Sequence, residues 1–146
     1  MTNEYMLETA MRQSAIDLGC DAGDFTSSKP KAVISKANEN ARKYLELPFY
    51  CQLVSYGSNV VASVDEEIKQ DVEAYITKYA PEHCFETPNM LVLQRALNMR
   101  GMTACCRAEY WLFDINRAEH IECPYEIHIL GPEDFKALYL PQWSNA

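Results

Sequence analysis

The chain has 146 residues, of which 48% are hydrophobic and 23% are charged, and its formal net charge is -8. This composition is typical of a folded domain, and roughly two-thirds of the unfolded surface could be buried in a chain of this length. The acidity argues against a nucleic-acid partner, because binding to phosphate backbones depends on clustered Lys and Arg. No apolar run approaches the roughly 20 residues that span a bilayer, and the polar N-terminus does not resemble a signal peptide. We therefore expect a cytoplasmic protein with no membrane partner.

The first third of the chain predicts a helix and a short strand. Apolar residues recur at helical spacing over residues 3–18, and Gly19 is a helix-stopping residue. Residues 20–30 are rich in turn-forming residues, and residues 32–35 form a candidate strand. We expect residues 38–42, which are polar, to be a connection.

The middle of the chain predicts a β-hairpin followed by helices. Residues 47–56 and 60–64 read as strands, and Gly57-Ser58-Asn59 between them is a plausible tight turn, which would make the strands antiparallel neighbours. Residues 65–79 carry a helical apolar stripe. An extended piece over 83–86 precedes a second helix, for which Thr87 supplies the cap and Pro88 the first position, and Gly101 the end.

Residues 102–113 alternate between two faces and predict a long strand, followed by a charged connector over 114–123 that contains the expected domain boundary. These elements together indicate an α/β or α+β fold with a mixed, largely antiparallel sheet flanked by helices. We expect one domain over residues 1–122 and a separate segment over 123–146.

The last segment reads as the start of a further unit. Residues 125–130 alternate like a strand, and Gly131-Pro132 then opens a predicted helix with Glu133 and Asp134 in its first turn. No second strand follows to complete this strand-helix unit. We expect the apolar side chains after it to fold back, to stay exposed or to form a homodimer contact; they are Leu138, Tyr139, Leu140 and Trp143.

Six cysteines and three histidines are present, but their spacing does not suggest a metal or redox site. No C-x-x-C pair occurs, and the histidines are scattered, so we predict no metal site. The segment 82–86 (EHCFE) concentrates acid, base and ligand side chains, yet its expected geometry offers no two-histidine site. Cys51 or Cys84 could be a nucleophile activated by His83, but alternation with apolar neighbours favours packing for Cys51.

One face of the predicted sheet is a candidate small-ligand site. Aromatic side chains mixed with convergent polar groups are typical of such pockets. The alternative is a half-covered sheet face on which Arg107 and Glu109 form an ion pair of little energetic value. The candidate substrate-binding residues are Tyr50, Gln52, Arg107, Glu109 and Trp111.

Three stretches carry a resemblance to a known family: LELPFYCQLVSYGSNVVASV, EHCFETPN and CPYEIHILGPEDFKALYLPQWSNA. On these the chain resembles the N-terminal portion of bacterial two-part proteins of the GNAT superfamily, the acetyl-CoA-dependent N-acetyltransferases. The resemblance runs along nearly the whole chain. It implies an N-terminal α/β domain followed by a GNAT module whose first strand and helix correspond to residues 125–140, and it leaves open a GNAT-like sheet in the N-terminal domain.

The cofactor motif of that superfamily is missing from the sequence. Acetyl-CoA pyrophosphate is bound at a helix N-terminus by R/Q-x-x-G-x-G/A, and Gln94 and Arg100-Gly101 do not reproduce it. Neither a glycine-rich phosphate loop nor a G-x-S-x-G nucleophile motif occurs. The resemblance therefore implies a non-catalytic domain that shapes the acceptor site or a dimer, with no cofactor in this chain and acetyl-CoA in the whole protein. A stand-alone ligand-binding or regulatory domain is the alternative, and a complete enzyme built on Arg107 and Glu109 is a third hypothesis.

Overall fold

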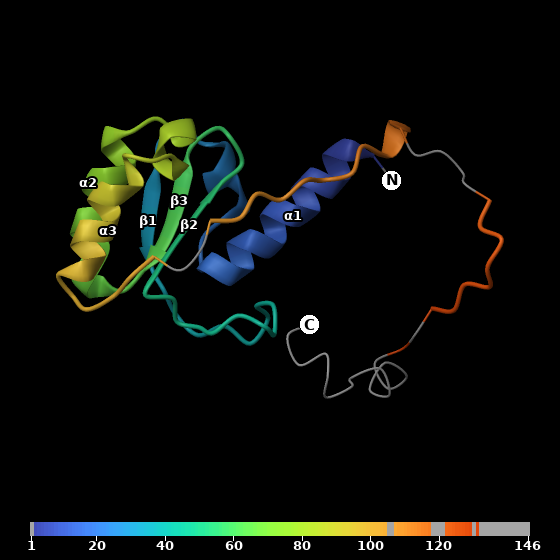
Figure 1. Ribbon diagram of the computed structural model, residues 1–146, viewed down its shortest axis with the longest axis horizontal. Coiled ribbons are helices and arrows are strands. Elements are labelled where there is room, and N and C mark those ends of the chain that lie inside the picture. The colour runs from blue at the N-terminus through green and yellow to red at the C-terminus, as the bar shows by residue number, and fades with distance from the viewer. Residues whose placement is uncertain (1, 105–106, 118–121, 130, 132–146) are drawn as a thin grey trace. The chain divides into compact units, whose positions relative to one another are not determined.

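A computed structural model describes residues 2–104, 107–117, 122–129 and 131. The chain divides into two compact units, Met1–Asn116 and Arg117–Ala146. The first unit has a mixed α/β fold with a three-stranded sheet (Figure 1). The predicted fold class, a mixed sheet flanked by helices, is confirmed, whereas its likeness to a GNAT sheet stays a prediction.

The sheet has the strand order β1-β3-β2, so that β3 (Val60–Val64) lies in the centre. Strand β1 (Lys31–Ile34) is parallel to β3, and β2 (Cys51–Ser55) is antiparallel to it. The predicted hairpin between β2 and β3 is therefore confirmed. Its turn contains Gly57 at a φ of 101°, a backbone conformation that glycine adopts readily. All five residues of β3 are buried, because helices cover both faces of the sheet.

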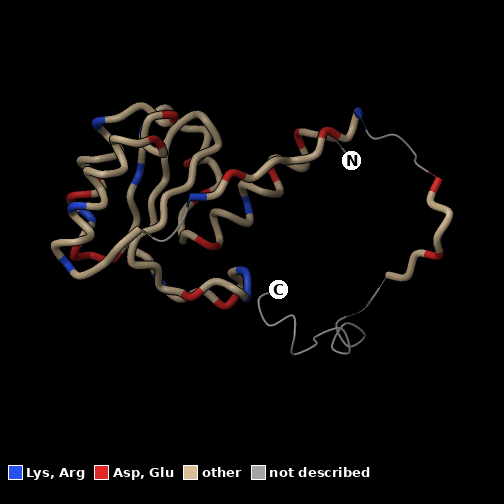
Figure 2. The backbone as a smooth tube through the Cα atoms, viewed as in Figure 1, with Lys and Arg blue, Asp and Glu red and all other residues tan. Residues whose placement is uncertain are grey.

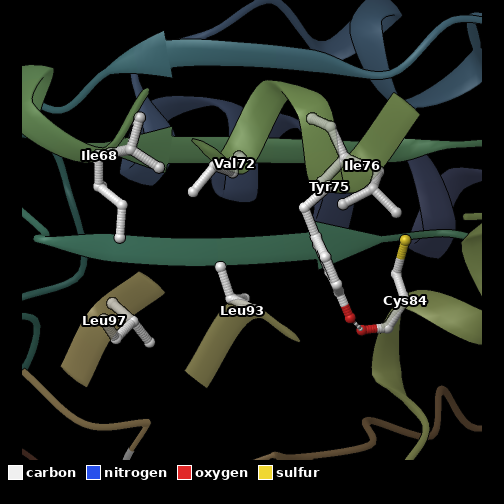
Figure 3. Packing of buried hydrophobic residues seen from close by; sticks show 10 residues of the cluster. Ile68, Val72, Tyr75, Ile76, Cys84, Leu93 and Leu97 are labelled. Carbon is white, nitrogen blue, oxygen red and sulfur yellow. Dashed lines mark hydrogen bonds between the residues drawn. The ribbon is translucent and has the colours of Figure 1, made fainter. Parts of the chain in front are cut away.

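Helices α2 (Lys69–Lys78) and α3 (Met90–Asn98) pack on one face of the sheet. Figure 3 shows their side chains meeting in a core. The fully buried Ile68 and Val72 have the helical spacing that the sequence predicts. Burial of each such aliphatic side chain stabilises the fold by about 1.5–3 kcal/mol. The hydroxyl of Tyr75 donates a hydrogen bond of 2.9 Å to the carbonyl of Cys84, which fixes the following turn against α2.

Helix α1 (Asn3–Leu18) covers the other face of the sheet with its C-terminal half. Its bounds agree with the predicted ones. The Thr2 side chain accepts a hydrogen bond from the N–H of Tyr5, and Gly19 ends the helix in a left-handed conformation at a φ of 73°. Phe25 from the short 3-10 helix Ala22–Thr26 is fully buried in the same cluster as Leu18.

Two predicted elements of the first unit are wrong, and one predicted helix is present but begins later than expected. Residues 102–104 and 107–113 contain no strand. Alternation of side chains is compatible with a strand, but a strand forms only where a neighbouring strand is available for pairing. Residues Pro81–Phe85 form a 3-10 helix and not an extended piece, with Pro81 at its first turn. Helix α3 begins at Met90, and the Thr87 side chain does not cap it.

In the second unit the description covers residues 117, 122–129 and 131. The strand predicted over 125–130 is not formed at Tyr125–Ile129, where these side chains are exposed. Exposed apolar residues without a neighbouring strand have no partner to complete a ladder. The predicted helix with Glu133 and Asp134, and the predicted dimer contact of Leu138, Leu140 and Trp143, lie outside the described residues. The division at 122/123 stays a prediction.

Candidate interaction surface

An open hollow of about 330 Å³ lies between α2 and α3. Ala74 on α2 and Ala96 on α3 are the two residues with the shortest side chains in its lining. The hollow is lined by Asp71, Ala74, Tyr75, Lys78, Tyr79, Val92, Leu93, Arg95, Ala96 and Met99. We call this set of residues the α2–α3 surface.

The α2–α3 surface carries a second apolar stripe on α3. Leu93 and Leu97 are buried in the core, whereas Val92, Ala96 and Met99 follow one another at the i, i+4, i+7 spacing that places side chains on one helix face. The exposed fraction of Val92 is 44% and that of Met99 is 77%. Helix α3 is thus apolar on the face that packs on the core and also beside the hollow.

Two cationic side chains border this hollow without a carboxylate partner among the described residues. Lys78 lies 5.1 Å from the centre of the Tyr79 ring, a cation-π arrangement. Arg95 lies on α3 and is exposed. Figure 2 shows Lys and Arg positions on both helices of this otherwise acidic chain. The surface therefore combines an apolar stripe with unpaired positive charge.

Arg100, at the end of α3, has a structural role. Its guanidinium donates a hydrogen bond of 2.7 Å to Asp71 Oδ2 and further bonds to the carbonyls of Glu67 and Ala96. These contacts join the C-terminal end of α3 to the start of α2, and a cation is favourable at a helix C-terminus. Because its donors already have protein acceptors, Arg100 holds the two helices together and leaves Lys78 and Arg95 as the cations available to a partner.

The structure does not place the five predicted ligand-binding residues on one sheet face. Gln52 is exposed on β2, and Tyr50 precedes that strand. Arg107 and Glu109 form an ion pair with each other, and Trp111 is 86% exposed, in a segment outside the sheet. The prediction of a shared face is wrong, because it required residues 102–113 to pair with the sheet. Binding of a ligand by any of these residues stays a prediction.

Tyr50 has a perturbed hydroxyl. That oxygen is buried without a hydrogen-bond partner among the described residues. Burial raises the pKa of the Tyr50 hydroxyl, and the carboxylate charge of Glu67 raises it further. Tyr50 does not line the α2–α3 surface.

The cysteines considered as nucleophiles are structural. Burial raises the pKa of the Cys51 thiol to about 11. It also raises the pKa of Cys84, whose Sγ lies 3.5 Å from the carbonyl of Tyr79. Both residues pack in the core between the sheet and α2. The packing predicted for Cys51 is confirmed, because its partly buried side chain packs against the core cluster.

His83 contacts a carboxylate and not a thiol. Its Nδ1 lies 2.8 Å from Glu86 Oε2, and both side chains are exposed. The hydrogen bond to Glu86, followed by the carboxylate charge, raises the pKa of His83. Across the ranges 2–104, 107–117 and 122–129, no cluster of three or more His, Cys, Asp or Glu side chains could hold a metal ion.

The helices described here by their bounds are all too short or too polar to cross a membrane. Helical spacing could have identified the α2–α3 surface in advance, since Val92, Ala96 and Met99 form a regular pattern beside the core stripe. The two cations could not have been assigned to it without the packing angle of α2 and α3. Comparison of the chain with protein-family models, with curated proteins and with solved structures finds no match.

Proposed function

We propose that this chain is the non-catalytic N-terminal domain of a GNAT-like protein that transfers an acetyl group from acetyl-CoA to an amine. In this proposal the domain acts by binding another part of the protein, the catalytic module, through the α2–α3 surface. The resemblance in the sequence supports the family. The exposed stripe of Val92, Ala96 and Met99 supports the mode of action, because apolar side chains arranged around a hollow are typical of protein interaction sites.

The charge of the α2–α3 surface defines the chemistry of its partner. Lys78 and Arg95 border the apolar stripe and lack carboxylate partners among residues 2–104 and 107–117. A complementary surface has an apolar ridge that fills the hollow and Asp or Glu side chains on each side of it. The proposed partner is therefore an apolar, acid-bordered helix or strand of the catalytic module.

The proposed location is the cytoplasm, and no nucleic-acid or membrane partner is part of this proposal. The net charge of -8 supports the absence of nucleic-acid and membrane partners, because it repels polyanionic surfaces. The isolated chain has no cofactor in this proposal, and acetyl-CoA belongs to the catalytic module.

The alternative is a stand-alone domain that binds a small ligand or has a regulatory role without catalysis. Its support is the volume of the hollow, about 330 Å³, which lies at the lower end of the range of about 300–1,000 Å³ for ligand pockets. Lys78 and Arg95 would then favour an anionic ligand. The hollow is open, so a small molecule would leave much of its own surface in water.

The reading frame after the codon for Ala146 distinguishes the two functions. We expect it to continue into a strand, the motif R/Q-x-x-G-x-G/A and a helix. A stop codon directly after Ala146 would contradict the proposal and favour the stand-alone domain.

A pair of matched variants tests the use of the α2–α3 surface in the longer protein. Val92→Glu and Gln70→Glu both place a carboxylate in the first turn of a helix, where it is compatible with the helix dipole. Val92 lines the hollow, whereas Gln70 does not. We expect amide exchange in α2 and α3 to be slower in the longer protein than in the 146-residue chain, and Val92→Glu alone to remove this protection. Equal protection in both variants would exclude this surface as the contact.

A further inference from the structure

Residues 125–129 (YEIHI) form an exposed segment of the second unit with the alternation of a strand. The exposed fractions are 79% for Tyr125, 72% for Ile127 and 96% for Ile129. No backbone hydrogen bond joins this segment to another described residue. Aromatic and β-branched side chains at every second position, together with unpaired backbone groups, favour pairing with another strand.

The two polar residues of the segment, Glu126 and His128, carry complementary groups. His128 Nε2 lies 3.3 Å from Glu126 Oε1, and both side chains are exposed. Residues two apart share one side of an extended chain, so Glu126 and His128 leave the apolar side chains on the other side. The segment therefore has one polar and one apolar face when it is extended.

The sequence of the segment complements itself about Ile127. In an antiparallel pair of two copies centred on Ile127, Glu126 of each copy lies opposite His128 of the other. The same register places Tyr125 opposite Ile129, and aromatic and β-branched residues stabilise a sheet when they lie opposite each other. A parallel pair in register would instead place Glu126 of one copy opposite Glu126 of the other, which is destabilising. Charge and packing thus favour the same antiparallel register, and this register requires residues 125–129 alone.

We propose that two copies of this chain associate through antiparallel pairing of residues 125–129, centred on Ile127. The contact is isologous, so the pair of Glu126 and His128 occurs twice and the interface closes on itself. It brings the apolar side chains of both copies together on one face and gives the unpaired backbone groups a partner. Because two paired strands alone are only marginally stable, the dimer is weak. The interface shares no residue with the α2–α3 surface, and this inference does not depend on the acetyltransferase proposal.

A matched pair of variants tests this register. Glu126→Lys and Glu122→Lys both replace an exposed glutamate of the second unit by lysine, but only Glu126 lies opposite His128 in the proposed pair. We expect sedimentation equilibrium under reducing conditions to show self-association of the unchanged chain as its concentration rises to the order of 1 mM. Glu126→Lys should weaken this association about tenfold, because both charge pairs are lost. Glu122→Lys should leave the association unchanged.

An equimolar mixture of Glu126→Lys and His128→Glu is the decisive sample. His128→Glu places carboxylates opposite each other in its own dimer, so this variant alone should also associate about tenfold more weakly. In the mixed dimer the new lysine of one copy lies opposite the new glutamate of the other. Association of the mixture should therefore return to that of the unchanged chain.

Circular dichroism of each variant should match that of the unchanged chain, since the three replaced side chains are exposed. A chain that is monomeric at about 1 mM, equal effects of Glu126→Lys and Glu122→Lys, or a mixture that does not recover would overturn the proposal. Association that is lost in Trp143→Ser but unaffected by Glu126→Lys would also overturn it, and would assign the contact to the segment around Trp143.

Discussion

Arg42 Nε lies 2.5 Å from Asp17 Oδ2, and this ion pair joins helix α1 to the segment between β1 and β2. The Asp17 side chain is 1% exposed. Its other oxygen accepts hydrogen bonds from the backbone N–H of Arg42 at 2.9 Å and from Gln13 at 3.0 Å. One carboxylate thus satisfies a side chain and a backbone group that lie 25 residues further along the chain.

Replacement of this carboxylate should destabilise the fold. Asp17→Ala removes both acceptors and leaves the N–H of Arg42 unpaired, so we expect the free energy of unfolding to fall by about 2–3 kcal/mol. Arg42 remains able to reach water, which keeps the loss below that of a fully buried pair. Urea denaturation measures the change. Glu8→Gln on the same helix breaks an exposed pair with Arg12 and should cost less than about 0.5 kcal/mol. Equal losses in the two variants would contradict this account.

Replacement of one atom in the Asn59 side chain should also lower the free energy of unfolding. Its Nδ2 donates hydrogen bonds of 2.7 Å to the carbonyls of Asp24 and Lys29, and the residue is 2% exposed. Asn59→Asp replaces this donor by a carboxylate oxygen facing two carbonyls. We expect a loss of about 3 kcal/mol in the free energy of unfolding at pH 7, measured by thermal or urea denaturation.

The control for Asn59 is Asn40→Asp, which makes the same chemical change at an exposed asparagine. It should alter stability by less than about 0.5 kcal/mol. If Asn59→Asp were no more destabilising than Asn40→Asp, the two hydrogen bonds would not hold the segment before β1 in place.

The pH dependence of His83 follows from its contact with Glu86. The hydrogen bond to Glu86 raises the pKa of His83 in the folded chain. The stabilising contribution of the protonated pair is therefore complete below the unfolded pKa of His and is lost as pH rises through the higher folded pKa. An NMR titration of the ring protons should give a pKa above the ordinary value of about 6.5. In Glu86→Gln the pKa should fall towards that value; the same pKa in both proteins would rule out the pair in solution.

Two of the elements that the sequence predicted correctly depend on contacts between residues close in the chain. Helix α1 follows from apolar spacing and Gly19, and the hairpin of β2 and β3 follows from alternation and the turn at Gly57. Residues 107–113 have the same alternation, but they have no neighbouring strand among the described residues. The alternation of these residues therefore predicted a strand, but it could not predict whether a neighbouring strand is present to pair with it.

The candidate site shows the same limit. The group of Tyr50, Gln52, Arg107, Glu109 and Trp111 required a sheet pairing that is absent among the described residues. The α2–α3 surface was accessible in part, because Val92, Ala96 and Met99 have helical spacing. Its hollow could not be predicted, since its lining combines residues from two helices whose packing the sequence does not give.

The binding of acetyl-CoA tests the central claim, that this chain is the non-catalytic part of a GNAT-like protein. Isothermal titration calorimetry should compare the 146-residue chain with the product of the whole reading frame. The chain lacks R/Q-x-x-G-x-G/A, whose backbone N–H groups would bind the pyrophosphate. We predict no heat of binding for the 146-residue chain and a saturable isotherm for the longer protein. Micromolar affinity of acetyl-CoA for the 146-residue chain would contradict the account.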